Sequence, residues 1–284
     1  MINYINSLKN QLYVFAAQIK KHIQIQIRYP IDFFGQIFTV IFVGLWIIFF
    51  IIALSSTEQG TDSAIGNFTN IAVWGIVVYF LYTTSTWTIG RFVRQEQLTG
   101  TLESLWVTPA NKVWLLTSAG IGGFIVFLVA NVIIVGGFAL FADISFNNIG
   151  LSLLILFLTI LQSIGFGFLY GALVFKIKNA EVISNLVQFS LLIFSAVAFP
   201  FSIFPPWFLW VSRLIPFSWV VDAFRSSMGG LEPELISVGI LGLSPLLTEV
   251  LLIIVINTIL LTVGISAYRR VLKKSLKDGT LSHY

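Results

Sequence analysis

Uncharged and mostly apolar stretches alternate with short polar segments from one end of the chain to the other. A hydrocarbon core of roughly 30 Å requires about 20 apolar residues in a helix, so each of these stretches is long enough to cross a bilayer. The pattern therefore predicts an all-α polytopic membrane protein with six transmembrane helices. We place the spans at 33–54, 68–90, 112–141, 150–175, 182–203 and 247–268.

Basic residues are distributed unevenly among the loops that join these predicted spans. If both termini are cytoplasmic, all of the 16 Lys and Arg residues except Arg213 and Arg225 fall on the cytoplasmic side. Cytoplasmic loops of membrane proteins carry an excess of Lys and Arg, so this asymmetry sets the predicted orientation. We expect a multi-pass protein of the cell (cytoplasmic) membrane with both termini inside the cell.

The N-terminal segment, 3–28, has the pattern of an amphipathic helix. Apolar residues recur at steps of three and four, while Lys9, Lys20, Lys21 and Arg28 lie elsewhere on the helix surface. Helices of this kind lie in the membrane interface. The segment is then either a simple anchor or a lever that touches a cytoplasmic partner. Its recurring apolar residues are Ile5, Leu8, Leu12, Phe15, Ile19 and Ile23.

The whole chain, 1–284, is predicted to form a single transmembrane domain. It comprises the interfacial helix at 1–30, the six-span bundle at 31–268 and a basic cytoplasmic tail at 269–284. The stretch 199–230 interrupts the bundle because it is rich in proline, which breaks helices, and in tryptophan, which favours the headgroup level. We expect short outer-leaflet helices there, before the sixth span.

Composition narrows the possible functions. Charged residues make up 10% and hydrophobic residues 57% of the chain, and the mean hydropathy is +0.94, values far from those of soluble domains. The net charge of +4 reflects the basic loops, so we expect no nucleic-acid partner. With no cysteine, and His22 and His283 as the only histidines, the sequence predicts no metal site and no thiol chemistry. No catalytic residues are predicted, and the chain is not expected to be an enzyme.

The most specific pattern lies in the predicted cytoplasmic stretch 91–116. Leu98, Leu102, Leu105 and Trp106 are spaced to form one face of a short helix, with Glu96 and Glu103 on other faces. Thr108 followed by Pro109 has the form of an N-cap and a first helical position. The pattern predicts a short amphipathic helix across the inner surface, followed by a capped helix that enters the membrane.

This stretch resembles the signature of ABC-2 type permeases, the transmembrane subunits of ATP-driven exporters. A second resemblance is the proline-led segment before the last span, which reads IPFSWVVDAFR and contains Pro216, Ser218, Trp219, Asp222 and Arg225. Asp222 and Arg225 are three residues apart, so they can pair within one helical turn, although direct contact with a substrate is the alternative. The signature matches at Glu96, Gly100, Thr101, Leu102, Glu103, Leu105, Thr108 and Pro109.

The resemblance implies a half-channel that lacks its own motor. Family members pair as homodimers or heterodimers, and each docks a separate ABC ATPase, two copies in all, through the segment equivalent to 91–108. Trp106 lies within this coupling segment. No glycine in the chain is followed by lysine, so the phosphate-binding loop G-x-x-x-x-G-K-[ST] is absent from the sequence. We therefore expect no cofactor in this chain, with ATP and Mg bound by the partner.

Polar and small residues within the predicted spans have two interpretations each. Thr84 and Thr88 belong to a threonine cluster that either back-bonds to its own helix or lines the path. Asn185 and Gln188, on one face with Leu192, either line the path or bond between helices. Glu181 and Glu249 lie at span ends, where a carboxylate can reach water. Glycines in the third and fourth spans, among them Gly136, Gly137 and Gly165, are expected to allow close helix packing.

The cargo is the least determined part of the prediction. The sequence favours export of a small hydrophobic molecule, drug or lipid, with membrane lipid as a further partner. Export of a polysaccharide or glycolipid by the same architecture is the alternative. A secondary transporter or channel that needs no ATPase is a third interpretation, but it predicts inverted repeats and paired charges in mid-membrane, neither of which the sequence contains.

Overall fold

Helix is the regular secondary structure throughout the described part of the chain. The structure is a computed structural model that describes residues 2–31, 34–35, 38–39, 41–43, 45–46, 49, 62–102, 105, 108, 111–139, 143–177, 180–236, 238–240 and 242–278. Those residues contain no strand, in agreement with the predicted all-α class. The elements are α1 (Ile2–Arg28), α3 (Asp62–Leu98), α5 (Lys112–Phe138), α6 (Ile149–Val174), α7 (Ala180–Phe194), a 3-10 turn (Phe201–Ile203), α8 (Pro206–Leu214), α9 (Pro216–Gly229) and α10 (Pro245–Asp278).

Four of the described helices are long and apolar enough to cross a membrane. Their apolar parts are Gly66–Leu98, Lys112–Phe138, Ile149–Val174 and Pro245–Ser275, which coincide with the predicted second, third, fourth and sixth spans. The first predicted span, 33–54, lies largely outside the described residues. The count of six spans therefore stays a prediction.

The fifth predicted span is a shorter helix than the sequence suggested. α7 ends at Phe194 instead of continuing to 203, and its 15 residues rise only about 22 Å. Ala196 adopts a positive φ of 50° just beyond the helix. The next carbonyl, that of Val197, lies so close to α3 that a Cβ on Gly75 would be 1.9 Å from it. The helix therefore stops where the chain turns tightly over the glycine of α3.

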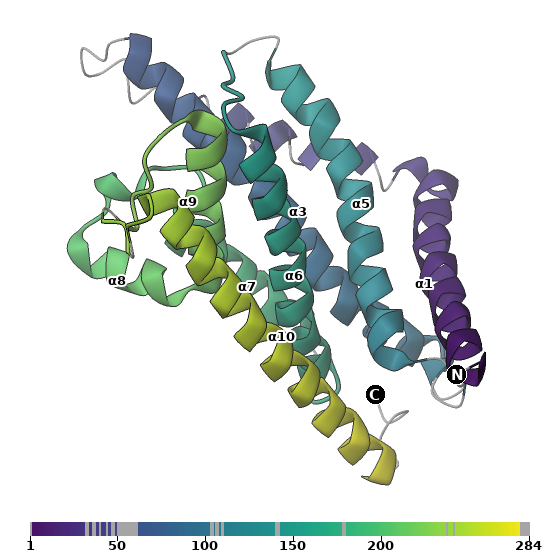
Figure 1. Cartoon of the computed structure of the whole chain (residues 1–284). Helices are drawn as coiled ribbons and strands as arrows, with labels where there is room; N and C mark the ends of the chain where they lie inside the picture. The colour runs from purple at the N-terminus through teal and green to yellow at the C-terminus, as the bar shows by residue number, and fades with distance from the viewer. Residues whose placement is uncertain are drawn as a thin grey trace.

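The long helices are arranged side by side in the order α10, α6, α3, α5 and α1 (Figure 1). α3 is the middle helix of this row, α6 lies between α3 and α10, and α1 packs on α5 at one edge. α8 and α9 lie at the opposite side, where α9 contacts α3, α6 and α10. The short helices expected in the proline-rich stretch are thus present, and α9 is part of the bundle core.

α6 and α10 approach each other so closely that their backbones nearly touch. A Cβ on Gly264 would lie 2.3 Å from the Gly165 carbonyl oxygen, and a Cβ on Gly165 would lie 3.0 Å from the α10 backbone at Leu260. The expectation that Gly165 permits close packing is confirmed. For Gly136 and Gly137 the same expectation finds no support within the described residues, none of which would lie within 4 Å of a Cβ there.

α1 runs lengthwise and parallel along α5. Gln11 Oε1 accepts a hydrogen bond of 3.0 Å from the Asn111 backbone N–H, and the rings of Phe15 and Trp114 meet edge to face at 5.8 Å. Further along, His22 packs against Gly122. The predicted N-terminal helix is present, and α5 partly covers Phe15, Ile19 and Ile23 of its apolar face, whereas Leu12 is 56% exposed. Whether α1 lies in the membrane plane stays a prediction.

Candidate transport path and coupling segment

A cavity of about 330 Å³ lies between α3 and α7, and we name it the α3–α7 cavity. It brings together three of the residues predicted to line a path, Thr84 from α3 and Asn185 and Gln188 from α7. Leu192 does not line it, because that side chain packs against the apolar core instead. The described lining residues are Thr39, Phe80, Thr83, Thr84, Trp87, Arg91, Phe127, Tyr170, Glu181, Ser184, Asn185 and Gln188.

The wall between α3 and α7 is held by a hydrogen bond to the backbone. The Tyr79 hydroxyl donates to the Gln188 carbonyl oxygen at 3.1 Å. The Gln188 side chain therefore faces the cavity from a point on α7 that is fixed to α3. Asn185, one turn earlier, is exposed. A single turn of α7 thus presents two side-chain amides to the same space.

The threonine cluster of α3 divides between the two interpretations. The Thr83 hydroxyl donates to the Tyr79 carbonyl at 2.8 Å, and the Thr88 hydroxyl donates to the Thr84 carbonyl at 2.6 Å. These two residues back-bond to their own helix. The Thr84 hydroxyl makes no hydrogen bond within the described part of the chain and borders the cavity. Thr84 is therefore the member of this group that offers an unused polar group.

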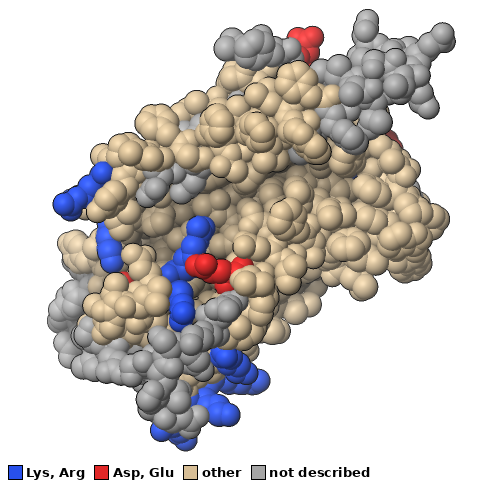
Figure 2. Space-filling model, turned by 180° about the vertical axis from the view of Figure 1, so that it is seen from behind, with Lys and Arg blue, Asp and Glu red and all other residues tan. Residues whose placement is uncertain are grey.

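A second cavity, of about 600 Å³, lies between α1, α3 and α5, and we name it the α1–α3 cavity. Thr84 and Arg91 line both cavities, so the two spaces share a wall. Thr88, also predicted to line the path, borders only the second. Figure 2 shows Lys, Arg, Asp and Glu side chains gathered in and beside a hollow on a largely uncharged face. Among the described charged residues, Arg91 and Glu181 line the α3–α7 cavity, and Lys21, Arg91 and Glu96 line the α1–α3 cavity.

The segment predicted to couple to an ATPase begins with a helix-ending turn. The Thr101 N–H donates to the Glu96 carbonyl and the Gly100 N–H to the Gln97 carbonyl, at 3.1 and 3.2 Å. Gly100 has a φ of +70°, so this is the glycine-dependent C-terminal motif of α3. Leu98 therefore belongs to α3 and is separated from Leu102 by the turn. The prediction that both lie on one face of a single short helix is wrong.

Leu102 packs into the permease's own interior. Its side chain is only 2% exposed, in a cluster with Val93, Leu116 and Tyr268. The resemblance implies that the stretch containing Leu102 contacts the ATPase, but the Leu102 side chain itself has no free surface to offer. Leu98 is 67% exposed, and Leu105 is half-buried. The coupling residues Glu103, Trp106 and Pro109 lie outside the described residues.

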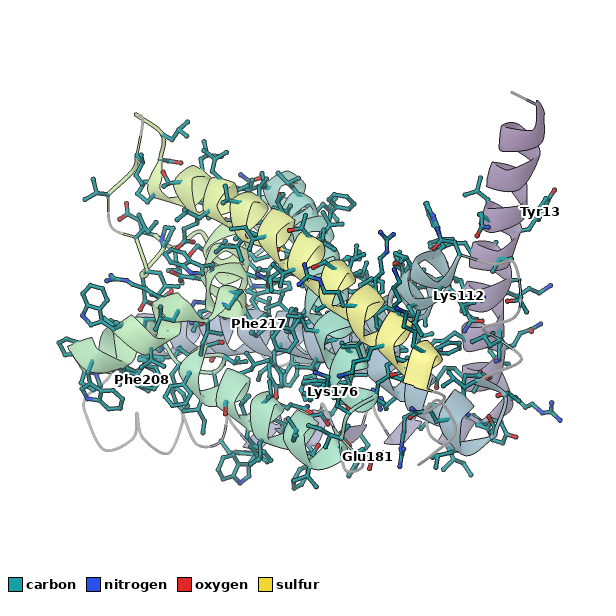
Figure 3. The ribbon with its side chains drawn as sticks, turned by 90° about the horizontal axis from the view of Figure 1, so that it is seen from below. Tyr13, Lys112, Lys176, Glu181, Phe208 and Phe217 are labelled. Atoms are coloured by element: carbon teal, nitrogen blue, oxygen red, sulfur yellow. The ribbon has the colours of Figure 1, made fainter. Side chains whose placement is uncertain are left out.

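α5 begins with a different cap from the one predicted. The N-cap is Asn111, whose side-chain oxygen accepts a hydrogen bond from the Val113 N–H at 3.0 Å. The Thr108 hydroxyl instead donates to the Leu105 carbonyl at 2.6 Å, so its predicted N-cap role is wrong. Lys112 donates to the Leu105 and Thr108 carbonyls at 2.8 and 2.6 Å. Lys112 lies at the start of α5 on the side of α1 (Figure 3), and it holds the preceding segment folded back.

Glu96 connects the end of α3 to α1. Its carboxylate accepts a hydrogen bond from the Thr101 hydroxyl and lies 3.8 Å from the Lys21 ammonium group. The pair is partly exposed, so its own contribution to stability is small. Its structural effect is to place α1, the Gly100 turn and the coupling segment in one connected unit.

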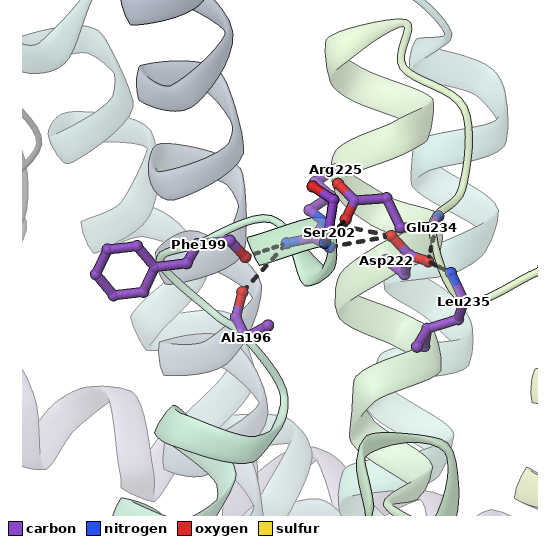
Figure 4. A network of polar contacts seen from close by, with 7 residues as sticks. All are labelled: Ala196, Phe199, Ser202, Asp222, Arg225, Glu234 and Leu235. Atoms are coloured by element: carbon purple, nitrogen blue, oxygen red, sulfur yellow. Dashed lines mark hydrogen bonds and ion pairs between the residues drawn. The ribbon is translucent and has the colours of Figure 1, made fainter. Parts of the chain in front are cut away.

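The proline-led segment IPFSWVVDAFR, 215–225, takes part in a network of polar contacts inside the structure (Figure 4). Pro216 is the first residue of α9, and the Trp219 indole N–H donates to the Arg213 carbonyl at 3.0 Å. Asp222 and Arg225 form the predicted ion pair, 3.2 Å apart. Arg225 also donates to the carbonyls of Ala196 and Phe199, beyond the end of α7. The motif therefore fixes the tight turn after α7.

Glu249 is buried, although its position at the end of a predicted span led us to expect contact with water. It lies beside the Asp222–Arg225 pair and is fully buried, so the expectation that it reaches solvent is wrong. Neither of its oxygens accepts a hydrogen bond from a described residue. Glu181 is exposed, as predicted. The sequence signal for an unusual site was an acidic residue one turn into an apolar helix. Its burial could not be predicted, because it results from the packing of α9 against α10.

Among the described residues, no cluster of His, Asp and Glu is suited to hold a metal ion.

Comparison with known proteins identifies the family. No curated protein matches the chain. The profile of the ABC-2 type transporter family matches residues 13–228, a range that includes the coupling segment, both cavities' α3 walls and most of α9. The chain therefore belongs to the ABC-2 type transporter family, as a membrane component of a transporter.

Proposed function

We propose that the protein is the permease subunit of an ATP-driven exporter, and that it carries a small hydrophobic molecule, drug or lipid across the cell membrane. The α3–α7 cavity is the main support. Its volume of about 330 Å³ falls in the range of roughly 300–1,000 Å³ that is usual for small-molecule sites. Aromatic side chains line it together with amide and hydroxyl groups and the charged Arg91 and Glu181, which suits a cargo with an apolar body and a few polar groups.

ATP hydrolysis is assigned to a separate ABC ATPase. The sequence has no Gly-Lys pair and hence no phosphate-binding loop. The complex would contain two permease chains, either a homodimer or a heterodimer with a similar permease, and two ATPase subunits. Both termini would be cytoplasmic, which places Lys176 inside the cell. A cysteine at Lys176, in a chain that has no other cysteine, should be unreachable by an impermeant reagent applied to intact cells.

The coupling surface would be built on the Gly100 turn. Leu98 ends α3 and exposes its side chain, while Leu102 fixes the following residues to the permease core. An ATPase that binds Leu98 at the end of α3 would pull directly on that helix. Because α3 carries Thr84 and forms one wall of the α3–α7 cavity, its movement would change the shape of that cavity.

Transport can be measured in inside-out membrane vesicles from the native host. Vesicles from a strain that lacks this chain, and from the same strain with the gene restored, are loaded with lipophilic fluorescent probes in the presence of ATP or a non-hydrolysable analogue. The proposal expects ATP-dependent accumulation only with the restored gene, and a lower rate for Asn185→Ala with Gln188→Ala. Accumulation that proceeds equally with the analogue would overturn the assignment to an ATP-driven transporter.

Export of a glycolipid is a second candidate because aromatic rings border the cavity. Phe80, Trp87, Phe127 and Tyr170 line the same space, and flat aromatic faces suit sugar rings as well as hydrocarbon. The cavity volume favours a small molecule over a long polysaccharide. The same vesicles, offered a fluorescent lipid-linked sugar beside an uncharged lipophilic dye, distinguish the two candidates by which probe accumulates.

A further inference from the structure

An apolar groove adjoins the α1–α3 cavity at the edge of the bundle that α1 and α5 form. It has a volume of about 370 Å³ and lies between the end of α1 and the middle of α5. Ile23, Ile27, Ile125 and Val129 contribute hydrocarbon to its walls. Val129 is 52% exposed, so the groove is open to whatever surrounds α5, one of the helices long and apolar enough to cross a membrane. A hydrocarbon chain of the bilayer can therefore reach it directly.

The groove and the two cavities form a series with shared walls. Gln26 and Val126 line both the apolar groove and the α1–α3 cavity. Thr84 and Arg91 line both the α1–α3 cavity and the α3–α7 cavity. A molecule that occupies the groove is therefore next to the α1–α3 cavity, which is next to the proposed transport path.

The α1–α3 cavity carries a positive charge, that of Arg91, with which no described carboxylate lining this cavity forms an ion pair. Lys21 is paired with Glu96 at 3.8 Å, so these two charges offset each other. Arg91 makes no ion pair or hydrogen bond within the described part of the chain, and its side chain is exposed to the cavities. Glu181 lies on the other side of Arg91, in the α3–α7 cavity, and its negative charge acts on the guanidinium from there. The Arg91 charge is therefore partly offset on that side, and an anionic group that enters from the groove would meet the guanidinium on the other.

Two further side chains, those of His22 and Gln26, offer polar groups to a headgroup bound in the α1–α3 cavity. Burial and the nearby Arg91 charge lower the pKa of His22 below its usual 6.5, so the imidazole is neutral at pH 7 and adds a polar group without charge. The Gln26 side-chain oxygen is buried at the junction of groove and cavity, and no described residue donates a hydrogen bond to it. Such an atom is costly to leave unpaired, and a hydroxyl or amine of a ligand would satisfy it.

We propose that the apolar groove and the α1–α3 cavity together bind an anionic membrane lipid, with its hydrocarbon chain in the groove and its negatively charged headgroup at Arg91. This inference rests on the proposed export function, because it identifies the class of cargo and the side from which cargo reaches the path. The bilayer interior is as apolar as the groove, so moving a chain between them gains little. Selectivity must therefore come from the headgroup charge.

Binding can be measured without ATP and without the ATPase, so its outcome is independent of the transport assay. A single cysteine replaces Val129 in the full-length cysteine-free chain, receives a small fluorophore and is reconstituted in nanodiscs. Lipids with a quencher on the acyl chain are added, bearing either a phosphoglycerol or a phosphocholine headgroup. The control site is Val132, on the same helix and 65% exposed but outside the groove lining. The proposal expects stronger quenching by the anionic lipid at Val129 and equal quenching by both lipids at Val132.

Charge variants test the role of Arg91. Arg91→Gln should reduce the anionic preference at Val129 by about fivefold, as expected for a partly exposed ion pair. Arg91→Lys should retain most of it. Arg94→Gln removes an equal charge one turn further along α3, at a residue that lines neither cavity, and should leave the preference unchanged. Equal quenching by both lipids at Val129, or an equal loss in Arg94→Gln, would mean that the groove is filled by bulk lipid without recognition, and would overturn the proposal.

Discussion

Arg225 and Asp222 form an ion pair that is closed to solvent, with side chains only 2% and 1% exposed. The pair is completed on both sides by backbone groups. Arg225 Nη1 donates to the Ala196 and Phe199 carbonyls at 3.1 and 2.9 Å, and Asp222 Oδ2 accepts from the Glu234 and Leu235 N–H groups at 2.8 and 2.7 Å. One helical turn of α9 therefore holds both the turn after α7 and the loop that leads towards α10.

Removing either partner of this pair should destabilise the protein strongly. Arg225→Leu leaves a buried carboxylate and two buried carbonyls without a donor, and we expect a loss of about 3–5 kcal/mol. The control is Arg213→Gln, at an exposed arginine on α8, which should cost less than about 1 kcal/mol. Thermal unfolding in detergent provides the comparison. Equal melting temperatures for the two variants would show that the network contributes nothing to stability.

Glu249 should tolerate a neutral replacement better than a positively charged one. Its oxygens are buried beside Asp222 and receive no hydrogen bond from a described residue, an environment that disfavours the charged form, so Glu249→Gln keeps the shape without introducing a charge. We expect Glu249→Gln to melt at or above the wild-type temperature. Glu249→Lys places a cation beside Arg225 and should reduce the yield of folded protein several-fold. A marked loss of stability in Glu249→Gln would contradict this expectation and show that the carboxyl group itself, and not only its shape, is needed at this position.

The contact between α6 and α10 should not accept a methyl group. Gly264→Ala would bring a Cβ to 2.3 Å from the Gly165 carbonyl oxygen, so the helices must separate. We expect a destabilisation of about 1–3 kcal/mol. Gly136→Ala is the matched control, because a Cβ there meets nothing within 4 Å and alanine favours the helix. Thermal melts that rank Gly264→Ala at or above Gly136→Ala would contradict the packing described.

Alanine variants of Leu98 and Leu102 should distinguish an effect on ATPase docking from an effect on folding stability. Leu102→Ala removes a side chain buried in the core and should cost about 2–5 kcal/mol of stability. Leu98→Ala removes an exposed side chain and should leave the melting temperature unchanged while it lowers ATP-dependent transport in vesicles at equal expression. Wild-type transport by Leu98→Ala would show that the end of α3 is not part of the coupling surface.

The contact between α1 and α5 should weaken in acid. The folded chain resists protonation of His22, whereas the unfolded chain takes up a proton near the usual pKa of 6.5. The unfolded state therefore binds more protons below that pH, so the stability contributed by His22 is complete above about 6.5 and declines as the pH falls further. His22→Gln, which cannot be protonated, should show a shallower decline. Melting temperatures measured between pH 7.5 and 5.5 for both proteins test this, and identical slopes would exclude His22 as the cause.

The sequence alone determined the features that depend on local chemistry. Apolar stretches of sufficient length predicted helices at the second, third, fourth and sixth spans, because the bilayer requires every backbone group to be paired within the helix. Proline and tryptophan in 199–230 predicted the short helices α8 and α9. The spacing of Asp222 and Arg225 predicted their pairing, since both lie within a single turn. The signature around Gly100 indicated the family.

Tertiary structure decided every feature that depends on which helices meet. Leu98 and Leu102 are four residues apart, a spacing that places two residues on the same face of a helix. A turn separates them, however, so that Leu98 is exposed and Leu102 is buried. Glu249 reads as a span-end carboxylate, but the packing of α9 against α10 encloses it. Thr83, Thr84 and Thr88 all border a cavity, but only the Thr84 hydroxyl makes no hydrogen bond within the described residues, whereas the other two bond back to their own helix. Helical periodicity assigns a residue to a face, and only the neighbouring helix determines whether that face meets solvent, core or a cavity.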